Sequence, residues 1–125
     1  MRIRLQDGLP LVAVTLGHRG QQIELEDVLL DTGSASTVFS VDRVASIGLE
    51  YEPEDAVHRI RGVGGSEFVF SKRADRVSVG ELQRNDFLIE IGAMEYGFRL
   101  DGILGMDFLV AVGAIIDLHE TEIHL

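Results

Sequence analysis

The segment Val28-Leu29-Leu30-Asp31-Thr32-Gly33-Ser34 places an aspartate directly after three apolar residues and directly before a Thr-Gly-Ser turn sequence. The apolar run predicts a buried strand. A carboxylate at the end of such a strand costs free energy unless it is hydrogen-bonded or shares a proton with a second carboxylate. Two interpretations follow. In one, Asp31 only accepts hydrogen bonds from the amides of a tight turn; in the other, it faces a second acidic group and the two act together.

The length and composition of the chain predict one globular domain that spans residues 1–125. A chain of this size can bury a single core but not two lobes, and an apolar content of 46% is typical of a folded protein. No apolar stretch approaches the roughly 18 residues that cross a bilayer. Because residues 1–7 also lack the apolar part of a secretory signal, we expect a cytoplasmic protein with no membrane partner.

Charge and residue types narrow the set of partners. The chain has 11 basic and 21 acidic residues, which gives a formal net charge of −10 at pH 7. Such a surface repels nucleic-acid phosphates, so we expect no DNA or RNA partner. Neutral or basic peptide segments suit it better, although an acidic surface also serves solubility alone. Cysteine is absent, which excludes disulfides, and the four histidines are scattered, so we expect surface histidines and no metal site.

Apolar runs separated by glycines predict a mostly-β chain with two small helices. We expect a first hairpin with strands over 9–16 and 23–31, a long hairpin over 57–79 and a closing hairpin over 114–125, with further strands over 37–40, 87–91 and 100–105. Helical turns are expected over 42–47, between a Ser40 cap and Gly48, and over 107–112, before Gly113. Residues 50–55 are expected to form a solvated acidic loop.

Three motifs follow one another along the chain: Asp31-Thr32-Gly33-Ser34, a glycine-rich tip at Gly62-Val63-Gly64-Gly65, and Asp101-Gly102-Ile103-Leu104-Gly105. An Asp-Thr-Gly string alone arises by chance. Here it follows three apolar residues and precedes an Ile-Leu-Gly that leads into a short helix. Together the motifs resemble the retropepsin family, the homodimeric aspartic peptidases that include retroviral proteases. The resemblance extends from about Leu9 to the C-terminal hairpin, and it implies an all-β, closed, barrel-like single lobe with one or two short helices and a flap hairpin.

The resemblance also implies a chemistry and a partner. Because the chain holds one Asp-Thr-Gly-Ser, the active site would be completed by a second copy, with Asp31 of each chain as the catalytic pair. Two adjacent carboxylates share a proton, so one can activate a water while the other protonates the scissile carbonyl. No cofactor or metal is needed, and the substrate is a peptide or protein. The alternative is a module of the same fold that dimerises or binds peptides without turnover.

The resemblance assigns roles to the neighbours of Asp31. Thr32 exchanges hydrogen bonds with its counterpart in the second chain, Gly33 permits close approach of the backbone, and the Ser34 hydroxyl donates to Asp31. The glycine-rich tip resembles the flap that closes over a peptide, although an ordinary hairpin turn explains the same glycines. Four apolar residues are expected to form the wall of the substrate pocket: Val38, Val63, Ile103 and Leu104.

The third motif and the residues after it are expected to support the catalytic loop from behind. Retroviral proteases have an ion pair between two positions that are occupied here by Ala35 and Met106. The chain therefore departs from the retroviral pattern and looks more like the retropepsin-like domains of cellular proteins. The C-terminal Ile123-His124-Leu125 is expected to contact the second chain. The supporting residues are Asp101, Gly102, Gly105 and Asp107.

Overall fold

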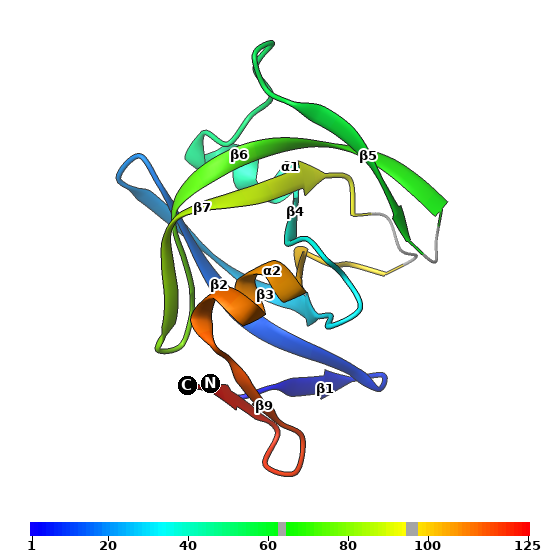
Figure 1. The fold of residues 1–125 in the computed structure, drawn as a ribbon, viewed down its shortest axis with the longest axis vertical. Coiled ribbons are helices and arrows are strands. Elements are labelled where there is room, and N and C mark those ends of the chain that lie inside the picture. The colour runs from blue at the N-terminus through cyan, green and yellow to red at the C-terminus, as the bar shows by residue number, and fades with distance from the viewer. Residues whose placement is uncertain (63–64, 95–97) are drawn as a thin grey trace.

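The computed structural model describes residues 1–62, 65–94 and 98–125, and it confirms an all-β single lobe (Figure 1). Two short α-helices and one 3₁₀ turn accompany the strands: α1 (Val41–Val44), η1 (Ala45–Ile47) and α2 (Met106–Val112). The strands are β1 (Arg4–Gln6), β2 (Leu9–His18), β3 (Gln21–Leu30), β4 (Val38–Ser40), β5 (Val57–Gly62), β6 (Gly65–Val79), β7 (Leu82–Gly92), β8 (Gly102–Leu104), β9 (Ile115–Asp117) and β10 (Glu122–His124).

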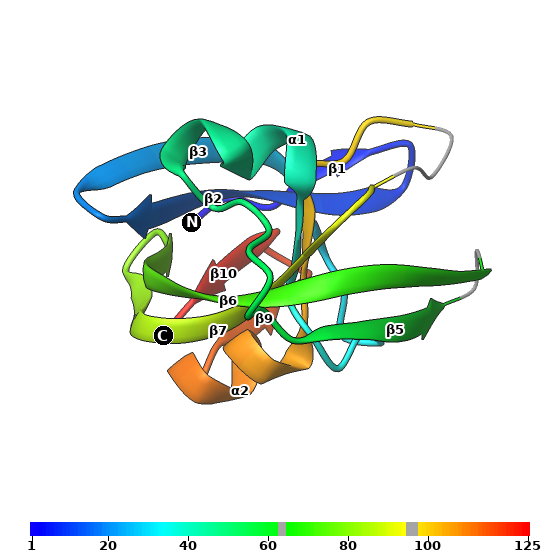
Figure 2. The ribbon, with the colours of Figure 1, turned by 90° about the horizontal axis from the view of Figure 1, so that it is seen from above.

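Eight strands form one sheet in the order β1-β2-β3-β8-β4-β7-β6-β5. A further pairing between β2 and β6, centred on Leu16 and Val77, joins the two halves of this sheet. The strands from β2 to β6 therefore close into a barrel, as expected. Figure 2 shows the two halves as layers, with β1, β2 and β3 in one and β5, β6 and β7 in the other.

The short β8 holds the middle of the sheet together. It runs parallel to β3, with Leu29 opposite Ile103, and antiparallel to β4, with Val38 opposite Ile103. Because β8 runs parallel to β3 with Leu104 opposite Leu30, the end of the third motif lies beside Asp31, the start of the first motif. That proximity is the basis of the candidate site.

The local signals in the sequence are mostly confirmed. Gly48 (φ 84°) and Gly113 (φ 65°) adopt the left-handed conformation that ends η1 and α2, where glycine has no Cβ to strain. Ser40 does precede α1, but its side chain makes no capping hydrogen bond. Strand β1 is not predicted by the sequence pattern. Strand β7 begins at Leu82 rather than at residue 87, because the buried Leu82 pairs with Val79 of β6 and the exposed residues 83–85 continue that pairing.

The two ends of the chain lie side by side (Figure 1). The amide of Ile123 donates to the Met1 carbonyl at 2.9 Å, and the Met1 amino group donates to the Ile123 carbonyl at 3.1 Å. On its other edge β10 pairs with β9, with Ile123 opposite Ile116. Both edges of β10 are thus occupied within the chain. The expectation that Ile123-His124-Leu125 contacts a second chain stays a prediction.

Candidate active site

Asp31 lies immediately after β3, where the pairing with β8 continues by one residue. Its amide donates to the Leu104 carbonyl at 3.0 Å, which fixes the backbone at the point where the strand gives way to the turn. Its side-chain Oδ1 accepts from the Gly33 amide at 2.9 Å. The carboxylate is half-buried, and in the described part of the chain no other residue binds its second oxygen. One oxygen is therefore oriented by the turn while the other remains accessible.

The Thr-Gly-Ser turn is anchored from both sides. The Ser34 amide donates to the Asp31 carbonyl at 3.2 Å, and the Met106 amide at the start of α2 donates to the Ser34 carbonyl at 2.8 Å. The Ser34 hydroxyl donates to the Ser36 carbonyl at 2.8 Å. The expected hydrogen bond from Ser34 to Asp31 is therefore absent in the single chain, because the hydroxyl closes the loop onto itself. Thr32 is exposed at the tip of the turn.

Behind the turn, the buried Thr37 and the half-buried Asp107 form a brace. The Thr37 hydroxyl donates to Asp107 Oδ1 at 2.7 Å and accepts from the Gly105 amide at 3.1 Å. The Thr37 amide donates to Asp107 Oδ2 at 3.2 Å. Asp107 also accepts from the Phe108 amide at 2.8 Å, within the first turn of α2, where a negative charge is favourable. This brace connects the turn that carries Asp31 to α2 through uncharged and carboxylate groups, without a cation among the described residues.

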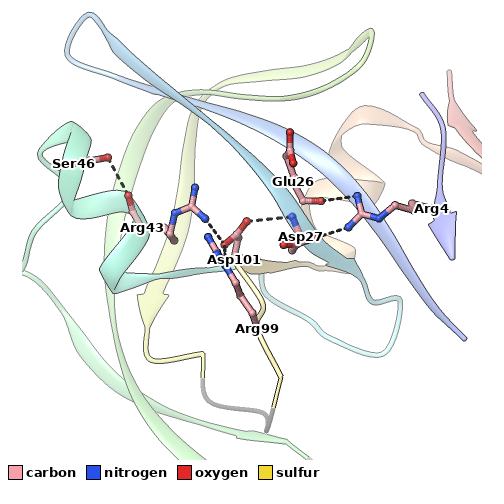
Figure 3. A network of polar contacts seen from close by, with 7 residues as sticks. All are labelled: Arg4, Glu26, Asp27, Arg43, Ser46, Arg99 and Asp101. Carbon is pink, nitrogen blue, oxygen red and sulfur yellow. Dashed lines mark hydrogen bonds and ion pairs between the residues drawn. The ribbon is translucent and has the colours of Figure 1, made fainter. Parts of the chain in front are cut away.

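A second polar network surrounds Asp101 (Figure 3). The Asp101 side chain is 2% exposed, and its Oδ1 accepts from Arg43 of α1 at 2.7 Å. Its Oδ2 accepts from the Asp27 amide at 3.1 Å, and Arg99 approaches at 3.7 Å. Beyond it, Asp27 forms an ion pair with Arg4 of β1. The buried carboxylate thus ties β3, the start of β8 and α1 together.

Two glycines in the third motif are required by close packing. A Cβ on Gly102 would lie 2.7 Å from both the Phe39 ring and the Val38 carbonyl oxygen. A Cβ on Gly105 would lie inside the contact distance of the Ser36 carbonyl and 2.9 Å from the Ser34 carbonyl oxygen. Real Cβ atoms do not approach so closely. Gly102 therefore allows β8 to lie against β4, and Gly105 allows the end of β8 to meet the turn that follows Asp31.

The side of the sheet opposite the main core carries a separate set of apolar residues, which we call the open face. Strand partners project side chains to the same side of a sheet. Leu29 is the partner of both Leu11 and Ile103, and Ile103 is the partner of Val38. Asp31 follows Leu29 by two residues, which places it at the end of this face. Leu11 and Val38 are buried but lie outside the main core cluster.

A comparison with protein families matches residues 12–108 to a family described as aspartyl protease. The match covers all three motifs and most of the chain. The chain belongs to the aspartyl protease family. No curated protein matches it. Among the described residues, no helix is long and apolar enough to span a membrane.

In this aspartyl protease, the structure places three of the four residues expected in the wall of the substrate pocket, and one of these three does not line it. Ile103 and Val38 lie on the open face, and they remain candidates for the wall. Leu104 is fully buried in the main core, because neighbouring residues of a strand point to opposite sides. Val63 lies outside the described residues, as does Gly64 of the glycine-rich tip. Gly62 and Gly65 pair with each other at the end of the β5–β6 hairpin.

Sequence reasoning missed a cavity of about 590 Å³ beside the open face of this aspartyl protease. Leu11 and Asp27 place it next to Leu29, since Leu11 is the partner of Leu29 and Asp27 precedes it by two residues. No motif marks these residues, because β1 and the segment before Asp101 come together only in the fold. The cavity is lined by Gln6, Asp7, Leu9, Leu11, Asp27, Phe98 and Arg99.

Proposed function

We propose that the chain is an aspartic endopeptidase that acts as a homodimer, with Asp31 of each chain at the two-fold axis. The observation that carries this proposal is the geometry of Asp31. Its Oδ1 is held by the Gly33 amide, while the exposed residues Thr32 and Gly33 form the outermost part of the turn. A turn presented in this way can meet its counterpart from a second chain. A single chain of residues 1–125, as one domain, would then supply half of the active site.

The reaction follows from two carboxylates held close together. Like charges at that distance do not both ionise, so the pair keeps one proton over a wide pH range. The ionised Asp31 removes a proton from a bound water, and the water attacks the scissile carbonyl carbon. The protonated Asp31 gives its proton to the carbonyl oxygen and becomes ionised. When the C–N bond breaks, the other Asp31 passes the proton that it took from the water to the leaving amine. The ionised Asp31 then takes a proton from a hydroxyl of the tetrahedral intermediate as the carbonyl re-forms, which restores the pair. Peptide and water are the only reactants, and no covalent intermediate forms.

The open face supports a peptide substrate. An extended peptide offers main-chain hydrogen bonds to neighbouring strands and places alternate side chains in pockets. The half-buried Ile103 offers an apolar contact on the same face as Asp31, and the buried Val38 packs beside it. The β5–β6 hairpin is the candidate flap. The expected location in the cytoplasm stays a prediction.

Cleavage of a mixed peptide library between about pH 4 and 7 tests the proposal. We expect the wild-type protein to cleave and Asp31→Asn to reduce cleavage to background, because an amide cannot share or transfer the proton. Asp86→Asn is the matched control, since the Asp86 side chain is 79% exposed and distant in sequence from the three motifs. Light scattering at micromolar concentration should report two chains. A folded dimer without cleavage would indicate the binding module instead, and residual cleavage by Asp31→Asn would contradict the role of Asp31.

A further inference from the structure

A row of paired side chains crosses the open face from the catalytic end toward the candidate flap. Ile103 of β8 is the partner of Val38 of β4, Val38 is the partner of Glu90 of β7, and Glu90 is the partner of Ser71 of β6. Because partners share a face, these four side chains form one continuous line. The line starts beside Leu29, two residues before Asp31. The apolar part of the line, Ile103 and Val38, therefore ends at the carboxylate of Glu90.

The surroundings of Glu90 are unusual for an acidic residue. Its side chain is only 11% exposed, and a buried carboxylate is costly unless it is well paired. Oε2 accepts from the Ser71 hydroxyl at 2.9 Å, and Oε1 lies 3.0 Å from Nε2 of His58 on β5. Neither partner carries a permanent charge, since imidazole is cationic only when protonated. In the described part of the chain, no lysine or arginine pairs with Glu90.

We infer that Glu90 determines substrate specificity and that it selects a basic side chain, lysine or arginine, in the bound peptide. This inference rests on the proposed function, because it assigns a subsite to the same cleft. The cation of the substrate would pair with Oε1, the oxygen now facing His58. The His58 side chain is 43% exposed, so the imidazole can turn toward solvent and vacate this position. The hydrogen bond from Ser71 would keep the carboxylate in place.

Distance and charge agree with this assignment. Three strand spacings separate β3 from β7, which amounts to roughly 14 Å at about 4.8 Å per spacing. An extended peptide covers that span with about four residues. A basic side chain a few positions from the scissile bond can therefore reach Glu90. The net charge of −10 favours the approach of cationic peptides as well.

Paired peptides that differ only in charge test the inference. A set of fluorogenic peptides carries lysine or its uncharged analogue norleucine at each position in turn. We expect wild-type protein to prefer lysine at one position by at least about tenfold in kcat/KM, the value expected for a charged hydrogen bond. In Glu90→Gln the lysine-to-norleucine ratio at that position should fall to about one. The ratio should stay at its wild-type value in Asp86→Asn, which removes an exposed charge from the same strand.

The lysine-to-norleucine ratios of the wild-type protein can overturn the inference by themselves. The test therefore does not depend on whether the Glu90→Gln variant folds. If norleucine is cleaved as well as lysine at every position, Glu90 selects nothing. A lysine preference that persists in Glu90→Gln would likewise assign selection to another residue. His58→Gln provides the second variant: it removes the competing imidazole, so the lysine preference should persist or increase. A ratio of one in His58→Gln would contradict the assignment.

Failure of the proposed function gives a different result from failure of this inference. If the wild-type protein cleaves none of the peptides, the binding of the same labelled pairs is measured by fluorescence anisotropy. In that case the missing cleavage rejects the proposed catalysis, and lysine-selective binding that is lost in Glu90→Gln would still support the subsite. Equal binding of lysine and norleucine peptides would reject the subsite.

Discussion

The hydroxyl of Thr37 lies 2.7 Å from Oδ1 of Asp107, although the two residues are 70 positions apart in the sequence. Through this contact the turn that carries Asp31 is attached to the first turn of α2. The Thr37 carbonyl also accepts from the Glu90 amide at 2.9 Å. Thr37 therefore connects the turn that carries Asp31 with α2 and with β7, the strand that holds the inferred subsite.

Thr37→Val should destabilise the protein, because it removes the hydroxyl and leaves the Asp107 carboxylate and the Gly105 amide short of a partner. We expect the free energy of unfolding in urea to fall by about 2–3 kcal/mol, the cost of an unsatisfied buried polar group. Thr37→Ser keeps the hydroxyl and should recover most of this loss. Thr15→Val, on the half-buried face of β2, should change stability by no more than about 0.5 kcal/mol. Equal losses in Thr37→Val and Thr15→Val would contradict the role of the brace.

Gly105→Ala should separate β8 from the turn that follows Asp31. The added methyl group would collide with the Ser36 and Ser34 carbonyls, which are backbone atoms that cannot rotate away. We expect a loss of at least about 2 kcal/mol in unfolding free energy, together with lost cleavage. Gly17→Ala is the matched control, since its nearest neighbour would be the Arg76 Cβ at an ordinary 3.7 Å. A Gly105→Ala protein as stable and active as Gly17→Ala would refute this account of the packing.

The features predictable from the sequence are those that depend on neighbouring residues. The apolar run before Asp31 indicated a strand end, and the glycines at 48 and 113 indicated helix ends. Each of these signals lies within a few residues of the structure that it describes. The all-β class followed from the same local patterns, and the family motifs supplied the closed lobe that local patterns alone do not specify.

The features that the sequence did not reveal depend on contacts between distant segments. The acidic loop 50–55 was expected to be solvated, yet Glu52 and Asp55 bind Lys72 of β6 at 2.6 Å and 2.9 Å. The hydrogen bond from Lys72 lowers the pKa of Glu52 below its ordinary value. Glu90 stood in an apolar stretch with no motif, and its place beside Val38 follows from a parallel pairing of β4 with β7. Nothing local marks such a pairing, because register is decided by the assembled sheet.

Arg43→Gln should destabilise the fold through Asp101. The substitution leaves a carboxylate that is 2% exposed without its closest cation. Removing one partner of a buried pair costs several kcal/mol, but Arg43 is 30% exposed and Arg99 lies 3.7 Å from the same oxygen. We therefore expect a loss of about 2 kcal/mol in unfolding free energy. Arg73→Gln, which breaks an ion pair exposed on both sides, should cost no more than about 0.5 kcal/mol. Equal losses of unfolding free energy in Arg43→Gln and Arg73→Gln would mean that the buried pair stabilises the fold no more than an exposed one.

His18, expected on the surface, is 9% exposed at the end of β2, and its Nδ1 has no hydrogen-bond partner in the described chain. Burial lowers the pKa of His18 below its ordinary 6.5, and Arg19 and Lys72 lower it further, against the opposing effect of Asp75 and Glu52. The unfolded chain therefore binds a proton more readily than the folded chain. His18 accordingly contributes stability that is fully present above pH 6.5 and is lost as the pH falls below that value.

Urea unfolding of the wild-type protein and His18→Gln between about pH 5 and 8 isolates this contribution, because all other titrating groups are shared and cancel in the difference. We expect the stability of wild-type relative to His18→Gln to be constant above the ordinary histidine pKa and to decrease steadily below it. A pH-independent difference for His18→Gln would mean that the buried imidazole gains its proton equally in the folded and unfolded states, contrary to its lowered pKa.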